Sequence, residues 1–418
     1  MSAESSNRSS AADGNVIALV VSQVLGSIAI ALTLTVGSTS MAVVSGSDFV
    51  AGLGQASIII GASIITIPVA ALSARRGRRW GLGAAYVLGA VGATTLMLGF
   101  AAAAWPIMML GLLLCGGASV AGLAARFAAT DSAKSERDVP RLIAWVMWAS
   151  TVGSIIGPNF AGPLSNLFGD DYFAEAFLLI LIADALAATV VIGFLRPAGV
   201  ADQAHRPVLK QQLAMIQQDS RILTGIFVAT FGHAAMVALM AMAPVHLHHN
   251  ETQPGLIGLA ISTHMAGMYV FSPLVGQAVT KFGPRAISYL GLGLFAASAL
   301  TLALALHNLL LMVIGLLLLG IAWSCTMIAG SAMVTRAADA ATRISIQGVT
   351  DLSINVFGGV ASLLSGLFVN LTGYPQLAWV WFALVAVAFG VTRALLRTDN
   401  TGRSHSESLG TDSSPESV

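Results

Sequence analysis

Several titratable residues stand inside long apolar stretches of this sequence, and some have side chains that suit the binding and release of protons. The candidates are Asp184, His233, His264 and Asp351. An ionised carboxylate in hydrocarbon is costly, so such a group pairs with a cation, faces water or takes up a proton. We therefore take Asp184, near the middle of its stretch, as the candidate proton carrier. The alternative is a structural hydrogen bond between Asp184 and a neighbouring helix.

The other candidates for contact with protons or cargo either lack the full charge of an aspartate such as Asp184 or lie nearer the end of a predicted helix. Asp351 falls in the first turns of its predicted helix, where the helix dipole favours an anion, and we expect it to act in gating or in structure. His264 is a candidate contact for cargo or proton, with packing as the alternative. The remaining candidate cavity residues are His233, Gln23, Trp148, Asn159 and Asn355.

Two short basic stretches stand at matching places in the two halves of the chain. Gly283 follows Gly77 by 206 residues (283 − 77), and the cations around each glycine keep a similar spacing, which indicates an internal duplication. A tight turn at each glycine lets these cations reach carboxylates and helix carboxyl ends. The alternative is that the cations only set topology. The candidate gating residues are Arg75, Gly77, Arg78, Arg79, Asp131, Gly276, Lys281, Gly283, Arg285 and Asp351, with Asp131 the nearest partner for Arg75.

The composition is that of an integral membrane protein. Hydrophobic residues make up 56% of the chain and charged residues only 9%, too few to cover a soluble globule of this size. We find no Walker loop, no dinucleotide fingerprint and no nucleophile with a base outside the apolar runs, so an enzyme or an ATP-driven pump is not expected. No cofactor, metal site or nucleic-acid partner is expected either, and we expect a monomer.

Runs of about twenty apolar residues predict twelve transmembrane helices. The runs cover residues 16–40, 48–71, 80–101, 105–129, 141–164, 173–195, 222–245, 254–278, 285–306, 308–334, 345–369 and 374–396. We expect an all-α membrane protein with two pseudo-symmetric six-helix bundles, at 16–195 and 222–396. The remaining segments are expected to be a disordered N-tail (1–15), a cytoplasmic central loop (196–221) and a disordered C-tail (397–418).

The distribution of charge predicts the side of the membrane on which the termini lie. With the N-terminus inside, all 20 Lys and Arg residues fall in inner loops and at inner helix ends. Cytoplasmic loops are enriched in Lys and Arg, so we expect both termini in the cytoplasm. The excess of Arg over Lys, with abundant Ala and Gly, suggests a bacterial genome and hence a bacterial plasma membrane.

The twelve spans and the first basic stretch together resemble the major facilitator superfamily of transporters. The loop signature of that family reads Gly, any residue, Leu, a small residue, Asp, Arg, any residue, Gly, Arg, then Arg or Lys. Here Ala70 replaces the Gly and Ala74 replaces the Asp, and the matching residues are Leu72, Ser73, Arg75, Gly77, Arg78 and Arg79. The resemblance implies that this loop latches the two halves together in the outward-facing state. Because Ala74 carries no charge, Asp351 is a candidate to supply the missing one.

A second motif, in the fifth span, is similar to the signature of drug/proton antiporters within that superfamily. The matching residues are Gly153, Gly157, Pro158 and Gly162. Proline bends a helix and glycine lets a facing helix approach closely, so we expect a bent, tightly packed span at the interface of the halves. The alternative is that glycine and proline are simply common in membrane helices.

These observations predict a secondary transporter that exports lipophilic or amphipathic small molecules in exchange for protons by alternating access. Flexible thioethers and aromatic faces in the spans suit such cargo. One alternative is an importer or facilitator of a metabolite. Another is a membrane sensor or scaffold that has kept the fold without transport, which the replacement of the acid by Ala74 keeps open.

Overall fold

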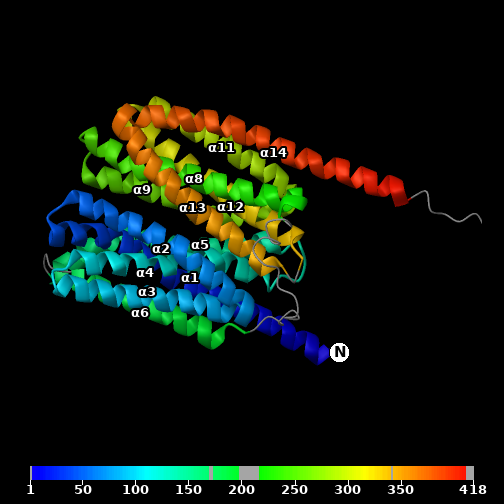
Figure 1. Ribbon diagram of the computed structural model, residues 1–418, viewed down its shortest axis with the longest axis horizontal. Coiled ribbons are helices and arrows are strands. Elements are labelled where there is room, and N and C mark those ends of the chain that lie inside the picture. The colour runs from blue at the N-terminus through cyan, green and yellow to red at the C-terminus, as the bar shows by residue number, and fades with distance from the viewer. Residues whose placement is uncertain (1, 169–172, 197–215, 340–341, 411–418) are drawn as a thin grey trace, which may run out of the picture.

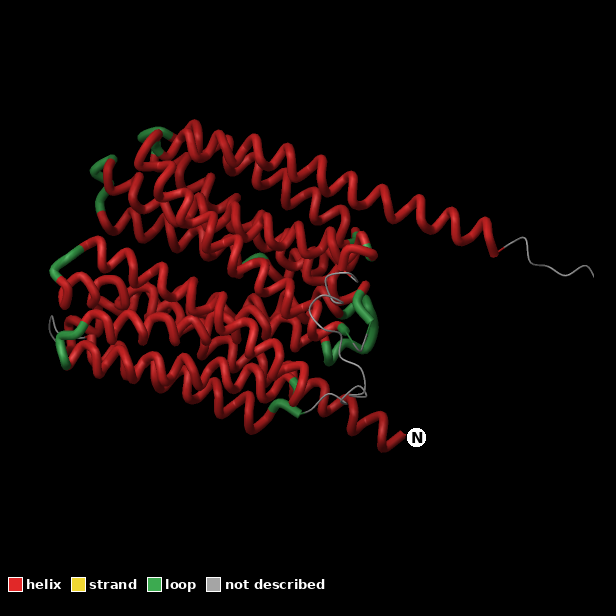
Figure 2. Tube along the Cα trace, in the orientation of Figure 1, coloured by secondary structure: helices red, strands yellow, loops and turns green. Residues whose placement is uncertain are grey.

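The computed structural model describes residues 2–168, 173–196, 216–339 and 342–410, and within them every regular element is a helix (Figures 1 and 2). The helices of the first half are α1 (Ser2–Ser45), α2 (Asp48–Arg76), α3 (Arg78–Ala101), α4 (Trp105–Thr130), α5 (Val139–Phe168) and α6 (Phe173–Phe194). Those of the second half are α8 (Ser220–His249), α9 (Pro254–Tyr269), α10 (Ser272–Phe282), α11 (Pro284–Ala305), α12 (Leu309–Ala337), α13 (Arg343–Thr372) and α14 (Tyr374–Gly410).

These helices supply the twelve predicted spans. Eleven segments of the described residues are long and apolar enough to cross a membrane, and one of them, Leu256–Phe282, combines α9 and α10. The twelfth is α5, with 30 residues. The expected all-α membrane fold is therefore confirmed, because apolar runs of this length bury their backbone polar groups only as helices.

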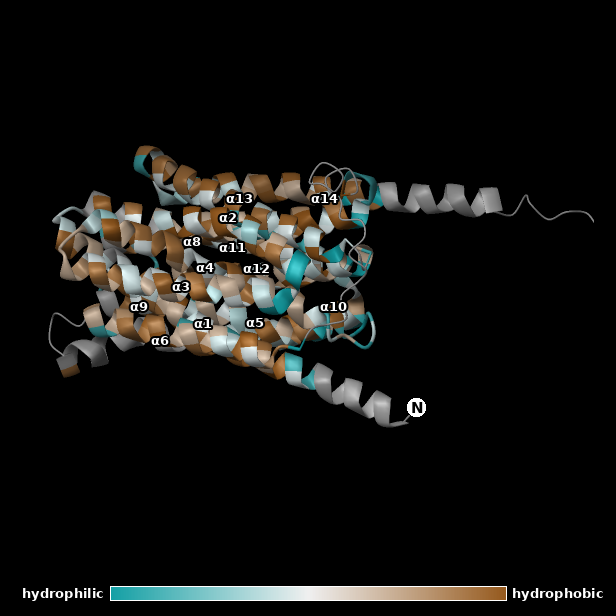
Figure 3. Ribbon diagram, turned by 60° about the horizontal axis from the view of Figure 1, so that its bottom comes forward, coloured by the Kyte–Doolittle hydropathy of each residue, from teal (hydrophilic) through white to brown (hydrophobic). Residues whose placement is uncertain are grey.

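The helices form two bundles, one from α1–α6 and one from α8–α14, which lie side by side (Figure 1). Both ends of the chain leave the molecule on the same side, which we call the terminal end (Figure 1). Hydrophobic residues cover the length of the helices, and hydrophilic residues gather near the terminal end (Figure 3). Large apolar side chains such as Ile67 of α2 and Leu363 of α13 are exposed, as expected for helices that contact lipid.

The duplication inferred from the basic stretches extends to the backbone. Gly77, between α2 and α3, and Gly283, between α10 and α11, have φ of +91° and +84°. Each donates its N–H to the carbonyl four residues earlier, at 2.9 Å and 3.0 Å. A non-glycine residue adopts this conformation only with strain, so the same turn recurs at the same place in each half.

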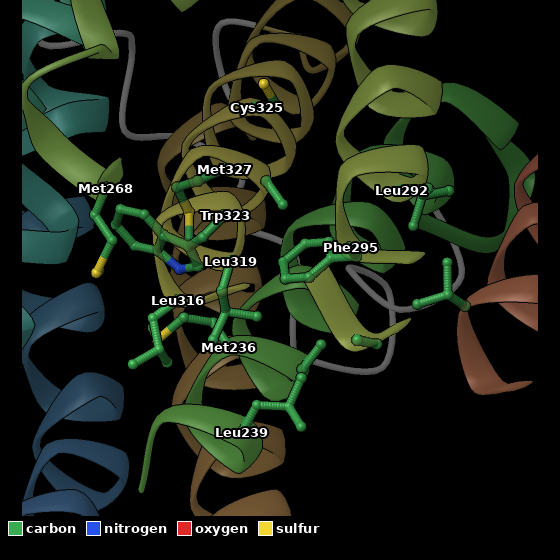
Figure 4. Packing of buried hydrophobic residues seen from close by; sticks show 14 of the residues in the cluster. Met236, Leu239, Met268, Leu292, Phe295, Leu316, Leu319, Trp323, Cys325 and Met327 are labelled. Carbon is green, nitrogen blue, oxygen red and sulfur yellow. The ribbon is translucent and has the colours of Figure 1, made fainter. Parts of the chain in front are cut away.

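Close helix contacts inside each bundle follow the same repeat. An ideal Cβ on Gly61 of α2 would lie 1.9 Å from the carbonyl oxygen of Leu113 on α4. On Gly267 of α9, 206 residues later, it would lie 2.6 Å from the carbonyl oxygen of Leu317 on α12. Larger apolar residues fill the remaining space, as Figure 4 shows around Trp323 in the second bundle. Small residues thus bring the helix backbones together, the usual packing of helices in lipid.

Helix α1 begins at Ser2 and helix α14 ends at Gly410, so both helices are longer than the predicted apolar runs. The disorder expected for the two tails stays a prediction. Neither residues 2–15 nor residues 398–410 contain a proline to stop the helix, so each span extends beyond its apolar run. Most of the expected central loop, residues 197–215, lies outside the described residues, as do 411–418. At the end of that loop, Ile216 is buried in a cluster with Ile222, Ile226, Val334, Ala338 and Ile346 of the second bundle.

Candidate functional site

A buried ion pair joins the two bundles. Arg126, in the last turns of α4, is 1% exposed. Its Nη2 lies 2.7 Å from Oδ1 of Asp351 on α13, and its Nε donates a 3.0 Å hydrogen bond to Oγ of Ser331 on α12. The guanidinium carbon also lies 4.4 Å from the ring centroid of Phe127. Both charges are thereby compensated inside the protein, and separating them would leave each buried without a partner.

Arg126 was not among the site residues predicted from the sequence, where it counted only as one of the cations that set topology. A usable signal was present: Arg126 is the one Lys or Arg inside the predicted span 105–129. A cation within an apolar helix is costly without a partner, so an acid on another helix had to be expected. Asp351 was expected to supply the acid that is missing at position 74. In the structure it is instead the partner of Arg126.

A second polar cluster lies at the start of α3. Arg78 Nε lies 2.8 Å from Oδ2 of Asp131, at the end of α4, and Arg78 Nη2 lies 3.3 Å from Oδ1. The same Nη2 donates a hydrogen bond to Oε1 of Gln347 on α13, and Gln347 Nε2 donates to Oγ1 of Thr335 on α12 at 3.1 Å. The cluster therefore begins in the first bundle and ends in the second.

Asp131 forms its salt bridge with Arg78. The sequence had suggested Arg75, three residues earlier, as its partner. The turn at Gly77 explains the choice, because it starts α3 at Arg78 and directs this side chain toward the end of α4. Arg75 remains on the last turn of α2 and is exposed. The neighbouring Arg79 lies with its guanidinium carbon 5.6 Å from the ring centroid of Trp80.

The second basic stretch lies against the loop between α4 and α5. Gly276 packs on α5, where an ideal Cβ would come 2.5 Å from Cβ of Ala144. Thr280 Oγ1 donates to the carbonyl oxygen of Arg137 at 3.2 Å. Nearby, Arg336 at the end of α12 donates two hydrogen bonds, of 3.0 Å and 2.7 Å, to the carbonyl oxygen of Glu136. Lys281 Nζ lies 5.2 Å from the ring centroid of Phe282, and Arg285 is the second residue of α11.

His233 lies on α8 in the second bundle. Trp323 Nε1 donates a 3.1 Å hydrogen bond to His233 Nδ1, which assigns the ring hydrogen of neutral His233 to Nε2. The ring of Tyr269 packs edge-on against Trp323, with centroids 5.6 Å apart. Gly358 of α13 faces the imidazole and leaves room for it.

Two amides lie near the ion pair. Gln23 of α1 donates to Oγ of Ser150 on α5 at 2.7 Å, and its Oε1 is buried with no partner among the described residues. Asn355 of α13 donates to Oγ1 of Thr66 on α2 at 3.3 Å and to the carbonyl oxygen of Asp351 at 2.9 Å. The Asn355 bond to Thr66 is another link between the bundles.

Asp184 and His264 lie within the bundles, away from these inter-bundle contacts. Asp184 on α6 is 1% exposed, it faces Gly89 of α3, and neither of its oxygens has a hydrogen-bond partner in the described part of the chain. His264 Nδ1 on α9 donates a 2.9 Å hydrogen bond to the carbonyl oxygen of Leu316 on α12. Its Nε2 is buried, and no described residue bonds to it.

The glycine and proline motif lies on α5, which packs against α1 in its own bundle and against α9, α10 and α12 of the other. An ideal Cβ on Gly153 would lie 2.3 Å from the backbone of Ser27, so α1 and α5 touch at this glycine. Trp148 is 37% exposed, and its ring packs edge-on against Trp145. Helix α5 also contains the other predicted residues, Gly157, Pro158, Asn159 and Gly162. The structure does not describe what surrounds them.

Comparisons with known proteins agree with this architecture. The family model described as Major Facilitator Superfamily matches residues 14–252 and 222–415. The uncharacterized MFS-type transporter YdeG of Bacillus subtilis is 31% identical over 373 residues, 86% of each chain. The riboflavin transporter RfnT of Brucella anthropi is 29% identical over 383 residues, 90% of this chain and 94% of the relative.

A solved structure gives the same result for the fold. The human organic anion transporter MFSD10 (TETRAN) superposes with a TM-score of 0.75 at 14% identity, over 91% of this chain and 99% of that protein. At this identity the match concerns the fold alone, and it covers both bundles. The family match, the curated relatives and the two joined bundles together show that this chain belongs to the Major Facilitator Superfamily of membrane transporters.

Proposed function

We propose that this protein exports lipophilic or amphipathic small molecules in exchange for protons by alternating access. The observation that carries the proposal is the Arg126–Asp351 pair, whose two members belong to different bundles. Together with the contacts of Arg78 and Arg336, this pair closes the molecule at the terminal end. If the bundles rock against one another, these are the bonds that break to open that end.

The orientation follows from charge. We place the terminal end, with both termini, in the cytoplasm of a bacterial cell, and the protein in the plasma membrane as a monomer. In support, the described Lys and Arg residues at loops and helix ends lie toward the terminal end, where hydrophilic residues gather (Figure 3). The conformation described above is then the one closed toward the cytoplasm.

Proton exchange requires an acid that is neutral in one state and charged in another. Asp184 is buried without a hydrogen-bond partner among the described residues, and the neutral acid avoids the cost of an unpaired charge. We propose that Asp184 carries the proton. Asp351 is the second candidate, because opening the terminal end would remove its counter-ion Arg126 and favour protonation.

Export of lipophilic cargo is supported by the motif of α5 and by the aromatic and thioether side chains near the inter-bundle contacts. His233, Trp323 and Tyr269 form an aromatic group in the second bundle. Such a group suits flat, weakly polar molecules.

Uptake of a metabolite is the second candidate function. The 29% identity to the riboflavin transporter RfnT over 90% of this chain favours it. Riboflavin is itself flat and amphipathic, so the same aromatic group suits it.

The deciding experiment is a flux measurement with inverted membrane vesicles that contain the protein and have an acid interior. Lipophilic cations, neutral drugs and riboflavin are added in turn, and collapse of the proton gradient is followed by a fluorescent dye. Export by proton exchange predicts collapse with a lipophilic compound and none in vesicles from cells that lack the protein. Riboflavin uptake by whole cells, without any such collapse, would replace the export proposal with the second candidate.

A further inference from the structure

The first basic loop lacks an acid, yet it reaches the second bundle. Ala74 stands where the loop signature has Asp. Arg78 nevertheless donates to Oε1 of Gln347 on α13, and Gln347 donates onward to Thr335 on α12. We propose that Gln347 is the positioning residue through which this loop closes the terminal end, in place of the acid missing at position 74. The proposal rests on the alternating-access function given above.

The contacts around Gln347 fix its orientation. The side chain is 1% exposed, and the bond from its Nε2 to Thr335 Oγ1 directs Oε1 toward the first bundle. Arg78 is held by two bonds to Asp131, so its guanidinium is already aimed when the bundles meet. A continuous chain of hydrogen bonds therefore runs from α4 to α12 through Arg78 and Gln347.

A neutral acceptor suits a contact that breaks in every transport cycle. When the bundles separate, Arg78 keeps its salt bridge to Asp131, and Gln347 keeps its bond to Thr335. No charge is left without a counter-ion. The Arg126–Asp351 pair differs in this respect, because each partner lies in a different bundle.

The position of Ala74 provides a direct test. Ala70 of α2 lies against Gly348 of α13, where an ideal Cβ would come 2.6 Å from Cβ of Ala70. Ala74 is one turn further along the same face of α2, toward the first turn of α13, which begins at Arg343. An aspartate at position 74 would thus face the amino end of α13, where the helix dipole favours an anion.

The experiment measures closure of the terminal end directly. Nitroxide labels are placed at Arg76→Cys and Arg393→Cys, which are exposed and belong to different bundles, with Cys115 and Cys325 replaced by Ala. The protein is held in lipid nanodiscs, and electron paramagnetic resonance gives the distribution of label distances. Short distances report the closed terminal end.

Gln347→Ala is expected to lower the ratio of closed to open molecules by about tenfold, the usual effect of losing a hydrogen bond to a charged group. Gln347→Glu keeps the acceptor and should stay closed. Adding Ala74→Asp to Gln347→Ala should restore closure. The control is Gln376→Ala, which removes an exposed glutamine near the start of α14 and should leave the distances unchanged.

An unchanged distribution in Gln347→Ala, or failure of Ala74→Asp to restore closure, would overturn the proposal. If Gln347→Ala does not fold, Thr335→Val serves instead, because it frees the amide of Gln347 and should shift the distances in the same direction. No shift in that variant would also overturn the proposal. The label distances need neither cargo nor a proton gradient, so a failed flux assay with a working latch would contradict only the proposed function.

Discussion

At the scale of single residues, most of the buried charged residues in the described part of the chain are paired. Arg126 is paired with Asp351 across the bundles, and Arg78 with Asp131 within one bundle. Asp184 is the exception among the buried acids, with no hydrogen-bond partner in the described residues. A paired charge stabilises a conformation, whereas an unpaired acid in hydrocarbon is held in its neutral form.

Asp351→Asn should destabilise the protein by about 3–5 kcal/mol, because it leaves the Arg126 charge buried without its partner. Unfolding of the purified protein in detergent measures the change. The double variant Arg126→Met with Asp351→Asn removes both charges and should regain most of the lost stability. If the double variant is as unstable as the single one, the ion pair does not account for the effect.

Asp184→Asn should leave the protein folded and remove the dependence of transport on the pH gradient, because an amide carries no exchangeable charge. The measurement is cargo flux in inverted vesicles with and without an imposed gradient. Asp13→Asn, which changes an exposed carboxylate on α1, is the matched control and should transport normally. A pH response of Asp184→Asn equal to that of the unchanged protein would remove Asp184 from the mechanism.

At the scale of helices, glycine decides both where they turn and how closely they pack. The turns at Gly77 and Gly283 share a positive φ and begin α3 and α11 at equivalent places. The first turn aims Arg78 at Asp131, so a backbone requirement positions a charged side chain. The turn at Gly77 therefore links the start of α3 to the Arg78–Asp131 salt bridge.

Gly77→Ala and Gly283→Ala should each destabilise the protein by about 1–3 kcal/mol, because a side chain at this φ is strained. Thermal unfolding in detergent tests both variants. Gly193→Ala is the control, since an added Cβ on α6 meets no atom within 4 Å. A cost at only one of the two turns would show that the duplicated loops are not equivalent in energy.

At the scale of the whole molecule, the bundles are joined at the terminal end by both polar bonds and close packing. The polar bonds include those of Arg126, Arg78 and Arg336, and the packing includes Gly348 on Ala70. The apolar cores lie mostly within single bundles, but the largest core of the second bundle also includes Val139, Ile143, Ala144 and Met147 of α5. Apart from this contact with α5, the division of the cores is the one that rigid-body rocking requires.

Gly348→Leu should prevent closure of the terminal end and lower transport by at least about tenfold, because the new side chain would occupy the space of Ala70. Flux and the label distances described above test the two effects together. Gly258→Leu is the matched control, since an added Cβ there meets no atom within 4 Å. Normal flux in Gly348→Leu would mean that α2 and α13 do not need this contact.

The sequence by itself determined the membrane class, the twelve spans and the duplication. The physical reason is that hydrocarbon demands about twenty apolar residues per helix, so each span is visible locally in the chain. The turn glycines were visible as well, because only glycine suits their backbone. The extension of α1 and α14 past their apolar runs was not visible, since polar helices lack that signal.

Only the tertiary structure decided which charges meet. Arg126 and Asp351 are 225 residues apart in sequence, and Arg78 and Gln347 are 269 apart. Nothing local in the chain specifies such partners, because they depend on how two separately folded bundles face one another. For the same reason, Asp131 could be recognised as a partner from sequence, but the choice of Arg78 required the geometry of the turn at Gly77.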